Sequence, residues 1–67
     1  DASTPKNVRQ MVQDAITALK NEKADYSLRI ANAVSLLDEA AQDPNIAVHT
    51  RVNIWNVMGL LESIKTR

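Results

Sequence analysis

Three arginines and one histidine are the side chains of this chain best suited to bind a charged ligand. Arg9, Arg29 and Arg51 each stand early in an apolar-faced segment that follows a polar turn, at similar intervals along the sequence. A planar guanidinium suits carbonyl oxygens and carboxylates as well as the oxygens of a phosphate. The sequence therefore supports two interpretations of this arginine row, one structural and one in which it binds RNA.

The structural interpretation starts from the helix dipole, which disfavours positive charge near the start of a helix. We expect each guanidinium to be compensated by carbonyl oxygens of a neighbouring turn or by an acidic side chain, such as Asp14, Asp38, Glu39 or Glu62. In the alternative, RNA or a ribonucleoprotein binds basic side chains at Lys6, Arg9, Arg29, His49 and Arg51. Eight acidic residues balance the eight basic ones, so general attraction to polyanions is not expected.

Neither catalysis nor metal binding is predicted by any residue pattern in the chain. His49 would need a partner and a reacting group within reach to act as a general base. Asp38 and Glu39 are adjacent, so on a helix they point about 100° apart and do not face each other. The chain has no cysteine and one histidine, which excludes disulfides and thiolate metal sites. We therefore predict no catalytic, cofactor-binding or metal-binding residue.

The elements that must position these side chains are amphipathic helices. Apolar residues recur at helical spacing in three segments, at about residues 5–20, 26–42 and 47–65. The chain is accordingly predicted to be one helical domain, residues 1–67, with an all-α fold built as a small antiparallel bundle. The recurring arginines also give it a weak helical-repeat character.

Polar residues mark where these helices begin and end. Thr4 is expected to cap the first helix with Pro5 at its first position, and Asp25 to cap the second. The Asp43-Pro44-Asn45 turn should stop the second helix after about residue 42, because the residue before a proline is pushed out of helical geometry.

The third helix carries apolar residues around much of its circumference, which predicts burial on more than one side. Gly59 in its middle costs about 1 kcal/mol relative to alanine, and close approach of a neighbouring helix would explain it. Trp55, the only tryptophan, is interpreted first as a core residue and alternatively as an interface anchor, because tryptophan is enriched in binding hot spots. The candidate residues for a protein interface are Trp55, Met58 and Leu60.

An ordered set of segments resembles one known family. The segments are Pro5-Lys6-Asn7-Val8-Arg9, Arg29-Ile30-Ala31-Asn32-Ala33, Leu37-Asp38-Glu39, Gln42-Asp43-Pro44-Asn45, His49-Thr50-Arg51 and Ile54-Trp55. Over nearly the whole chain they resemble a small archaeal family of uncharacterised proteins. The resemblance implies an all-helical bundle and a cytoplasmic archaeal protein, and it carries over no activity, cofactor or catalytic residue. It also implies a further amphipathic helix before Pro5, which would make four.

The leading functional prediction is a non-catalytic protein-interaction module or a small subunit of an archaeal assembly. It rests on the wide apolar face of the third helix, the neutral charge and the lack of catalytic groups. Without a fourth helix the other three would expose apolar surface, so we also expect dimerisation or marginal stability. RNA binding is the alternative, whereas DNA recognition is disfavoured because the third helix presents few polar residues for base edges. No apolar run approaches the ~20 residues of a membrane-spanning helix, so a membrane location is not expected.

Overall fold

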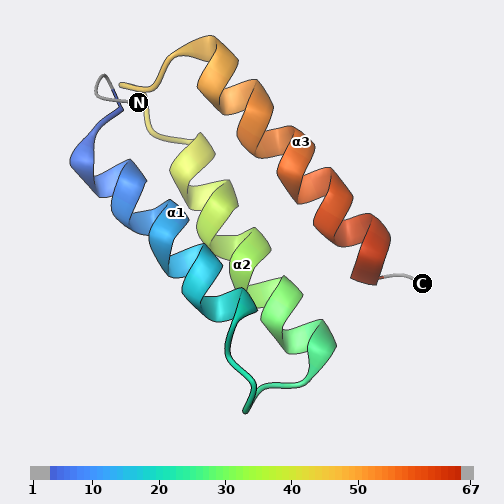
Figure 1. The fold of residues 1–67 in the computed structure, drawn as a ribbon. Coiled ribbons are helices and arrows are strands. Elements are labelled where there is room, and N and C mark those ends of the chain that lie inside the picture. Colours follow the sequence, from blue (N-terminus) through green and yellow to red (C-terminus); the bar gives the residue numbers. More distant parts are fainter. Residues whose placement is uncertain (1–3, 66–67) are drawn as a thin grey trace.

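The computed structural model describes residues 4–65, which form three antiparallel helices (Figure 1). They are α1 (Lys6–Leu19), α2 (Tyr26–Ala41) and α3 (Val48–Lys65), and each boundary lies within one residue of the range expected from the sequence. No strand occurs within the described part of the chain. The prediction of an all-α fold is confirmed.

The middle helix of the sequence is also the middle helix in space. Figure 1 shows α2 lying between α1 and α3. Both outer helices contact α2, whereas no Cα atom of α1 lies within 8 Å of one in α3. The backbones of the outer helices are therefore linked only through α2, and α3 is an edge helix.

The core is concentrated on α2. This helix contributes five of the buried apolar residues, which are Ile30, Ala33, Leu37, Ala40 and Ala41. Val8 and Ala15 of α1, Ile46 of the connecting loop and Ile54 of α3 complete the set. Ala33 and Ala40 are fully buried, and their small side chains let the neighbouring helices pack close to α2.

Only one residue of α3, Ile54, is buried. The expectation that this helix is buried on more than one side was therefore wrong. A wide apolar stripe shows that a helix can be covered on several sides, but among the described helices only α2 lies next to the backbone of α3.

The helix starts follow the sequence signals in one case and depart from them in the other. Asp25 caps α2 as predicted, and its Oδ1 accepts a hydrogen bond from the backbone N–H of Leu28 at 2.8 Å. The expected cap at Thr4 is wrong, because Pro5 itself is the N-cap of α1, with ψ at 145° and no side-chain hydrogen bond. Its carbonyl oxygen accepts the first helical bond from the N–H of Arg9 at 3.1 Å. A proline φ suits either position, so the residue type alone did not separate the two.

None of the described helices combines the length and the hydropathy needed to cross a membrane.

Candidate interaction surfaces

Two of the three arginines connect their helices to backbone carbonyl groups. The Nε of Arg29 donates to the carbonyl oxygen of Ala24 at 2.9 Å, just before α2 begins. The Nε of Arg51 donates to the carbonyl oxygen of Ala41 at 2.9 Å, and its Nη2 donates to that of Asp43 at 3.0 Å. The structural interpretation of Arg29 and Arg51 is thus confirmed. Arg51 ties the first turn of α3 to the carboxyl end of α2, where the helix dipole favours a cation.

Asp43 links all three helices at this end of the molecule. Its Oδ2 accepts a hydrogen bond from Nδ2 of Asn7 in α1 at 2.9 Å, and its Oδ1 accepts one from the N–H of Asn45 at 2.8 Å. These two bonds, with the nearby charge of Arg51, hold the pKa of Asp43 below its ordinary value of 3.8. Asn7 was not singled out from the sequence, because 36 residues separate it from Asp43 and no local pattern signals the contact.

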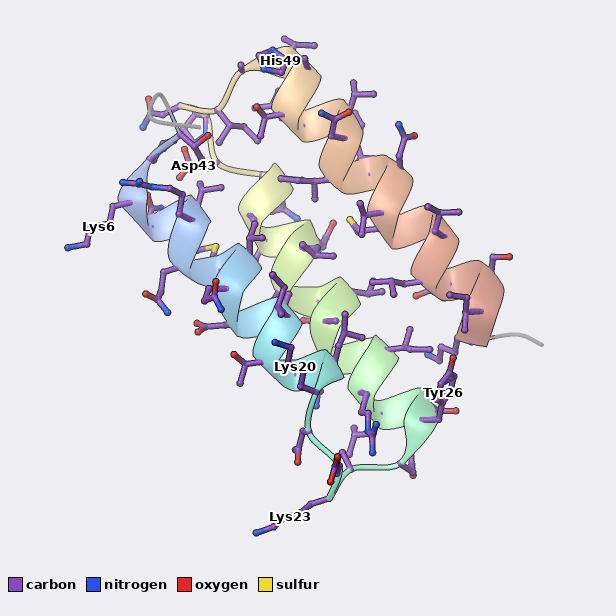
Figure 2. The ribbon with its side chains drawn as sticks, viewed as in Figure 1. Lys6, Lys20, Lys23, Tyr26, Asp43 and His49 are labelled. Carbon is purple, nitrogen blue, oxygen red and sulfur yellow. The ribbon has the colours of Figure 1, made fainter. Side chains whose placement is uncertain are left out.

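The side chains proposed to contact RNA do not form one row. Lys6 and Arg9 lie in the first turn of α1 and Arg51 in the first turn of α3, and Figure 2 shows Lys6 and His49 at the same end of the molecule as Asp43. Arg29 lies in the first turn of α2, beside Tyr26 at the opposite end. Lys6, Arg9 and His49 are exposed, whereas Arg29 and Arg51 are partly buried and bonded to carbonyl groups. Of the five residues proposed to contact RNA, only Lys6, Arg9 and His49 are exposed and could bind a phosphate.

A groove runs between α1 and α3, with α2 as its floor. Its middle section has a volume of about 310 Å³, and apolar side chains dominate its lining. The wall on α1 is formed by Val12, Ala15, Ile16 and Leu19, the floor by Leu37, and the wall on α3 by Thr50, Asn53, Ile54, Val57 and Leu61. Ile16 and Val57 remain 39% and 45% exposed, so their apolar surface faces solvent inside the groove.

The groove is more polar towards both ends. One end section, of about 380 Å³, shares four lining residues with the middle and adds Thr4, Val8, Arg9 and His49. The other, of about 220 Å³, shares Leu19 and Leu61 with the middle and adds Tyr26, Arg29, Ile30 and Ile64. From His49 to Ile64 the groove follows about 22 Å of helix, or four turns.

A second apolar surface lies on the side of α3 that faces away from the groove. Val48, Val52, Trp55 and Gly59 follow one another at intervals of four, three and four residues, and so lie within about 60° of arc. We call these four residues the outer stripe. Val48 is 72% exposed, Val52 42% and Trp55 53%. The interpretation of Trp55 as a core residue was therefore wrong.

Gly59, the last residue of the outer stripe, has no close neighbour in the structure, contrary to the prediction from the sequence. A Cβ atom built on Gly59 would meet no atom within 4 Å, and its φ is not positive. The expectation that a neighbouring helix of the fold passes close to Gly59 was wrong. Neither backbone conformation nor packing within the described structure requires a glycine at this position.

The three candidate interface residues do not share one surface. Trp55 lies on the outer stripe, whereas Leu60, at 65% exposure, points about 140° of arc away, towards the groove side of α3. Met58 is partly buried and packs against the core. The three residues therefore do not form the centre of a single surface that one partner could cover.

Among residues 4–65 there is no group of three or more histidine, cysteine or acidic side chains placed to hold a metal ion. The features that are present define a small all-α protein with two exposed apolar surfaces, one concave and one along an edge helix. By its sequence the chain belongs to the uncharacterised protein family UPF0147, whose profile matches residues 1–64. The resemblance to a small archaeal family is thereby confirmed.

Relatives from several archaea match almost the whole chain. A UPF0147 protein of Sulfurisphaera tokodaii is 45% identical over 65 residues, which are 97% of this chain and 73% of the relative. A UPF0147 protein of Pyrococcus furiosus is 43% identical over 65 residues, covering 97% of this chain and 70% of the relative. One from Metallosphaera sedula is 45% identical with the same coverage as the first. No solved structure matches the chain.

Proposed function

We propose that this protein is a non-catalytic interaction module of the cytoplasm, whose groove accepts an apolar helix of a partner protein. The groove is the observation that carries the proposal. Its apolar middle and polar ends match a helix of about four turns with an apolar stripe and polar ends, which is a common mode of helix recognition. A small subunit of a larger archaeal assembly would use the groove in the same way.

The energetics favour an apolar occupant. Ile16 and Val57 are large apolar side chains that stay partly exposed inside a concave surface, and covering them removes apolar area from water at about 25 cal/mol per Å². The middle section of the groove is near the lower limit of the ~300–1,000 Å³ typical of small-molecule pockets. Because it opens along its length into two further sections, an elongated occupant such as a helix fits it better than a compact ligand.

The test is an affinity purification with variants of the groove wall. Wild-type protein and the double variant Ile16→Glu/Val57→Glu would be immobilised and exposed to native archaeal extract, with and without RNase. Both positions are partly exposed, so we expect the variant to fold, which circular dichroism would check. Leu28→Glu is the matched control, because Leu28 is 49% exposed on α2 and lies outside the groove lining.

The proposal requires one defined protein that withstands RNase, binds wild type and Leu28→Glu, and is lost with the groove variant. A partner that binds the groove variant as well as wild type would refute it. Loss of every partner on RNase treatment would instead favour RNA binding through Lys6, Arg9 and His49.

A further inference from the structure

The outer stripe of α3 combines exposed apolar side chains with a glycine, and it lies apart from the groove. Val48, Val52 and Trp55 expose apolar surface on the side of the molecule away from the groove, and Gly59 continues their line. A glycine inside a helix costs about 1 kcal/mol relative to alanine. Nothing within the described fold approaches Gly59, so any contact that needs the small residue comes from outside residues 4–65.

We propose that the outer stripe is a seam at which α3 pairs, antiparallel, with α3 of a second copy of this chain. In that pair, Trp55 of each copy packs over Gly59 of the other. The proposal concerns a surface separate from the groove and does not depend on what the groove binds.

The self-complementarity of the stripe points to a second copy. The largest side chain and the smallest residue of the chain stand one helical turn apart on the same stripe, so each copy offers both a knob and a space. A two-fold axis at the level of Val57 brings residue 55 of one helix to the level of residue 59 of the other. In a parallel pair, Trp55 would meet Trp55 and Gly59 would meet Gly59, which crowds one level and leaves a void at the next.

The charges beside the stripe agree with the antiparallel orientation. Arg51 and Glu62 lie on the same flank of α3, within about 20° of arc of each other. Under the two-fold axis, Arg51 of one copy comes within about one residue of the level of Glu62 of the other, and the same flanks face each other. Arg51 stays bonded to the carbonyl oxygens of Ala41 and Asp43 in its own copy, so its charge lies at the level of the partner's Glu62 without like charges being brought together on that side. Asn56 and Ser63 on the other flank bring no like charges together.

The position of α3 in the fold allows this pairing. Among the described helices, the edge helix α3 has only α2 as a backbone neighbour (Figure 1). By helix periodicity the stripe lies on the side of α3 opposite to Thr50, Val57 and Leu61, which line the groove. A seam made of one helix from each copy should bury less surface than the ~1,200–2,000 Å² of a stable interface. We therefore expect a concentration-dependent dimer and not an obligate one.

Sedimentation equilibrium and the fluorescence of Trp55 test the proposal together on the full chain. Between about 1 μM and 1 mM, the range where a weak interface associates, the fraction of dimer should rise. The emission of Trp55, the only tryptophan, should move to shorter wavelength in parallel. Gly59→Leu fills the space for the partner's Trp55 and should weaken association about tenfold or more. This variant should fold, since a side chain at position 59 meets nothing and leucine favours helix.

Matched variants distinguish this seam from other contacts. Leu28→Ala removes an exposed leucine elsewhere, and Val57→Glu alters the groove, so neither should change association. Orientation is tested with single cysteines, because the chain has none of its own. Asn56→Cys lies beside the two-fold axis and should form a disulfide-linked dimer, whereas two copies of Ser63→Cys lie about 18 Å apart along the seam and should not.

Three results would overturn the proposal. The first is a monomer at every concentration with an unchanged tryptophan spectrum. The second is a dimer that survives Gly59→Leu but is lost with Val57→Glu, which would place the contact in the groove. The third is cross-linking of Ser63→Cys that equals or exceeds that of Asn56→Cys, which would exclude the antiparallel arrangement. Success or failure of the groove experiment affects none of these outcomes.

Discussion

Replacing Gly59 by alanine should make the isolated protein more stable. The added Cβ meets no atom within 4 Å, and the backbone at Gly59 has no positive φ that an L side chain would resist. The only large effect left is helix propensity, which favours alanine over glycine by about 0.8–1.0 kcal/mol in a helix interior. For a domain of 60–100 residues, 1 kcal/mol corresponds to a rise of about 4–8 °C in Tm.

The assay is thermal and urea unfolding followed by circular dichroism. It should be run at a few μM, about the lowest concentration that the method allows, so that self-association adds little to stability. Asn56→Ala is a useful comparison, because Asn56 is also exposed in the middle of α3 and asparagine differs from alanine by only about 0.7 kcal/mol or less. Gly59→Ala should therefore exceed Asn56→Ala in its stabilising effect.

An unchanged or lower stability of Gly59→Ala would refute this reasoning. It would mean that an atom of the chain does lie close to position 59 in solution. A stability that rises at low concentration, together with weaker dimerisation at high concentration, is the pattern expected if Gly59 serves the seam and not the fold.

Three further predictions concern the links around α2. Arg51→Met should lower the free energy of unfolding by about 1.5–3 kcal/mol, because hydrogen bonds from a charged group to two carbonyl oxygens are lost. Arg9 is exposed, so Arg9→Met should change the free energy of unfolding by no more than about 0.5 kcal/mol. Both changes would be measured by urea titration. Asp43 has a lowered pKa, so its contribution to stability is fully present above its ordinary value of 3.8 and is lost at lower pH, as the pH falls through the lowered pKa of the folded state. Asp43→Asn should therefore flatten the fall in stability between about pH 5 and pH 2, and an unaltered slope would contradict the assignment. Ala40→Leu should overpack the fully buried site where α2 meets its neighbours and lower the free energy of unfolding by about 1–3 kcal/mol or more. The loss of helical circular dichroism on heating measures this effect. A Tm equal to that of wild type would show that the site has room for the larger side chain.

Local signals in the sequence were sufficient for the helices but not for their exposed faces. Asp25 and the Asp43-Pro44 turn act through neighbouring residues, so their roles could be predicted. The places of Arg29 and Arg51 near helix starts predicted compensation by carbonyl oxygens or by acidic side chains, and the structure shows the first of these. These are short-range effects of capping and of the helix dipole.

Tertiary contacts decided the rest. Because α3 is apolar around most of its circumference, periodicity could not show which arc faces α2, and the burial of Trp55 and the packing of Gly59 were therefore predicted wrongly. The bond between Asn7 and Asp43 joins residues far apart in sequence and had no pattern to reveal it. The groove arises from how α1 and α3 are placed on either side of α2, which no single segment specifies.

The central place of α2 makes the two outer helices separable from each other. Because α1 and α3 are joined through α2 and not through each other's backbone, the structure resembles a short linear array in which each element depends on its immediate neighbour. With one buried residue, α3 can separate locally while α1 and α2 stay paired, so its amides should exchange with solvent sooner than those of α2. We therefore expect α3 to separate from the fold more easily than α1 or α2. Because α3 carries both the outer stripe and one wall of the groove, its separation would change both surfaces at once.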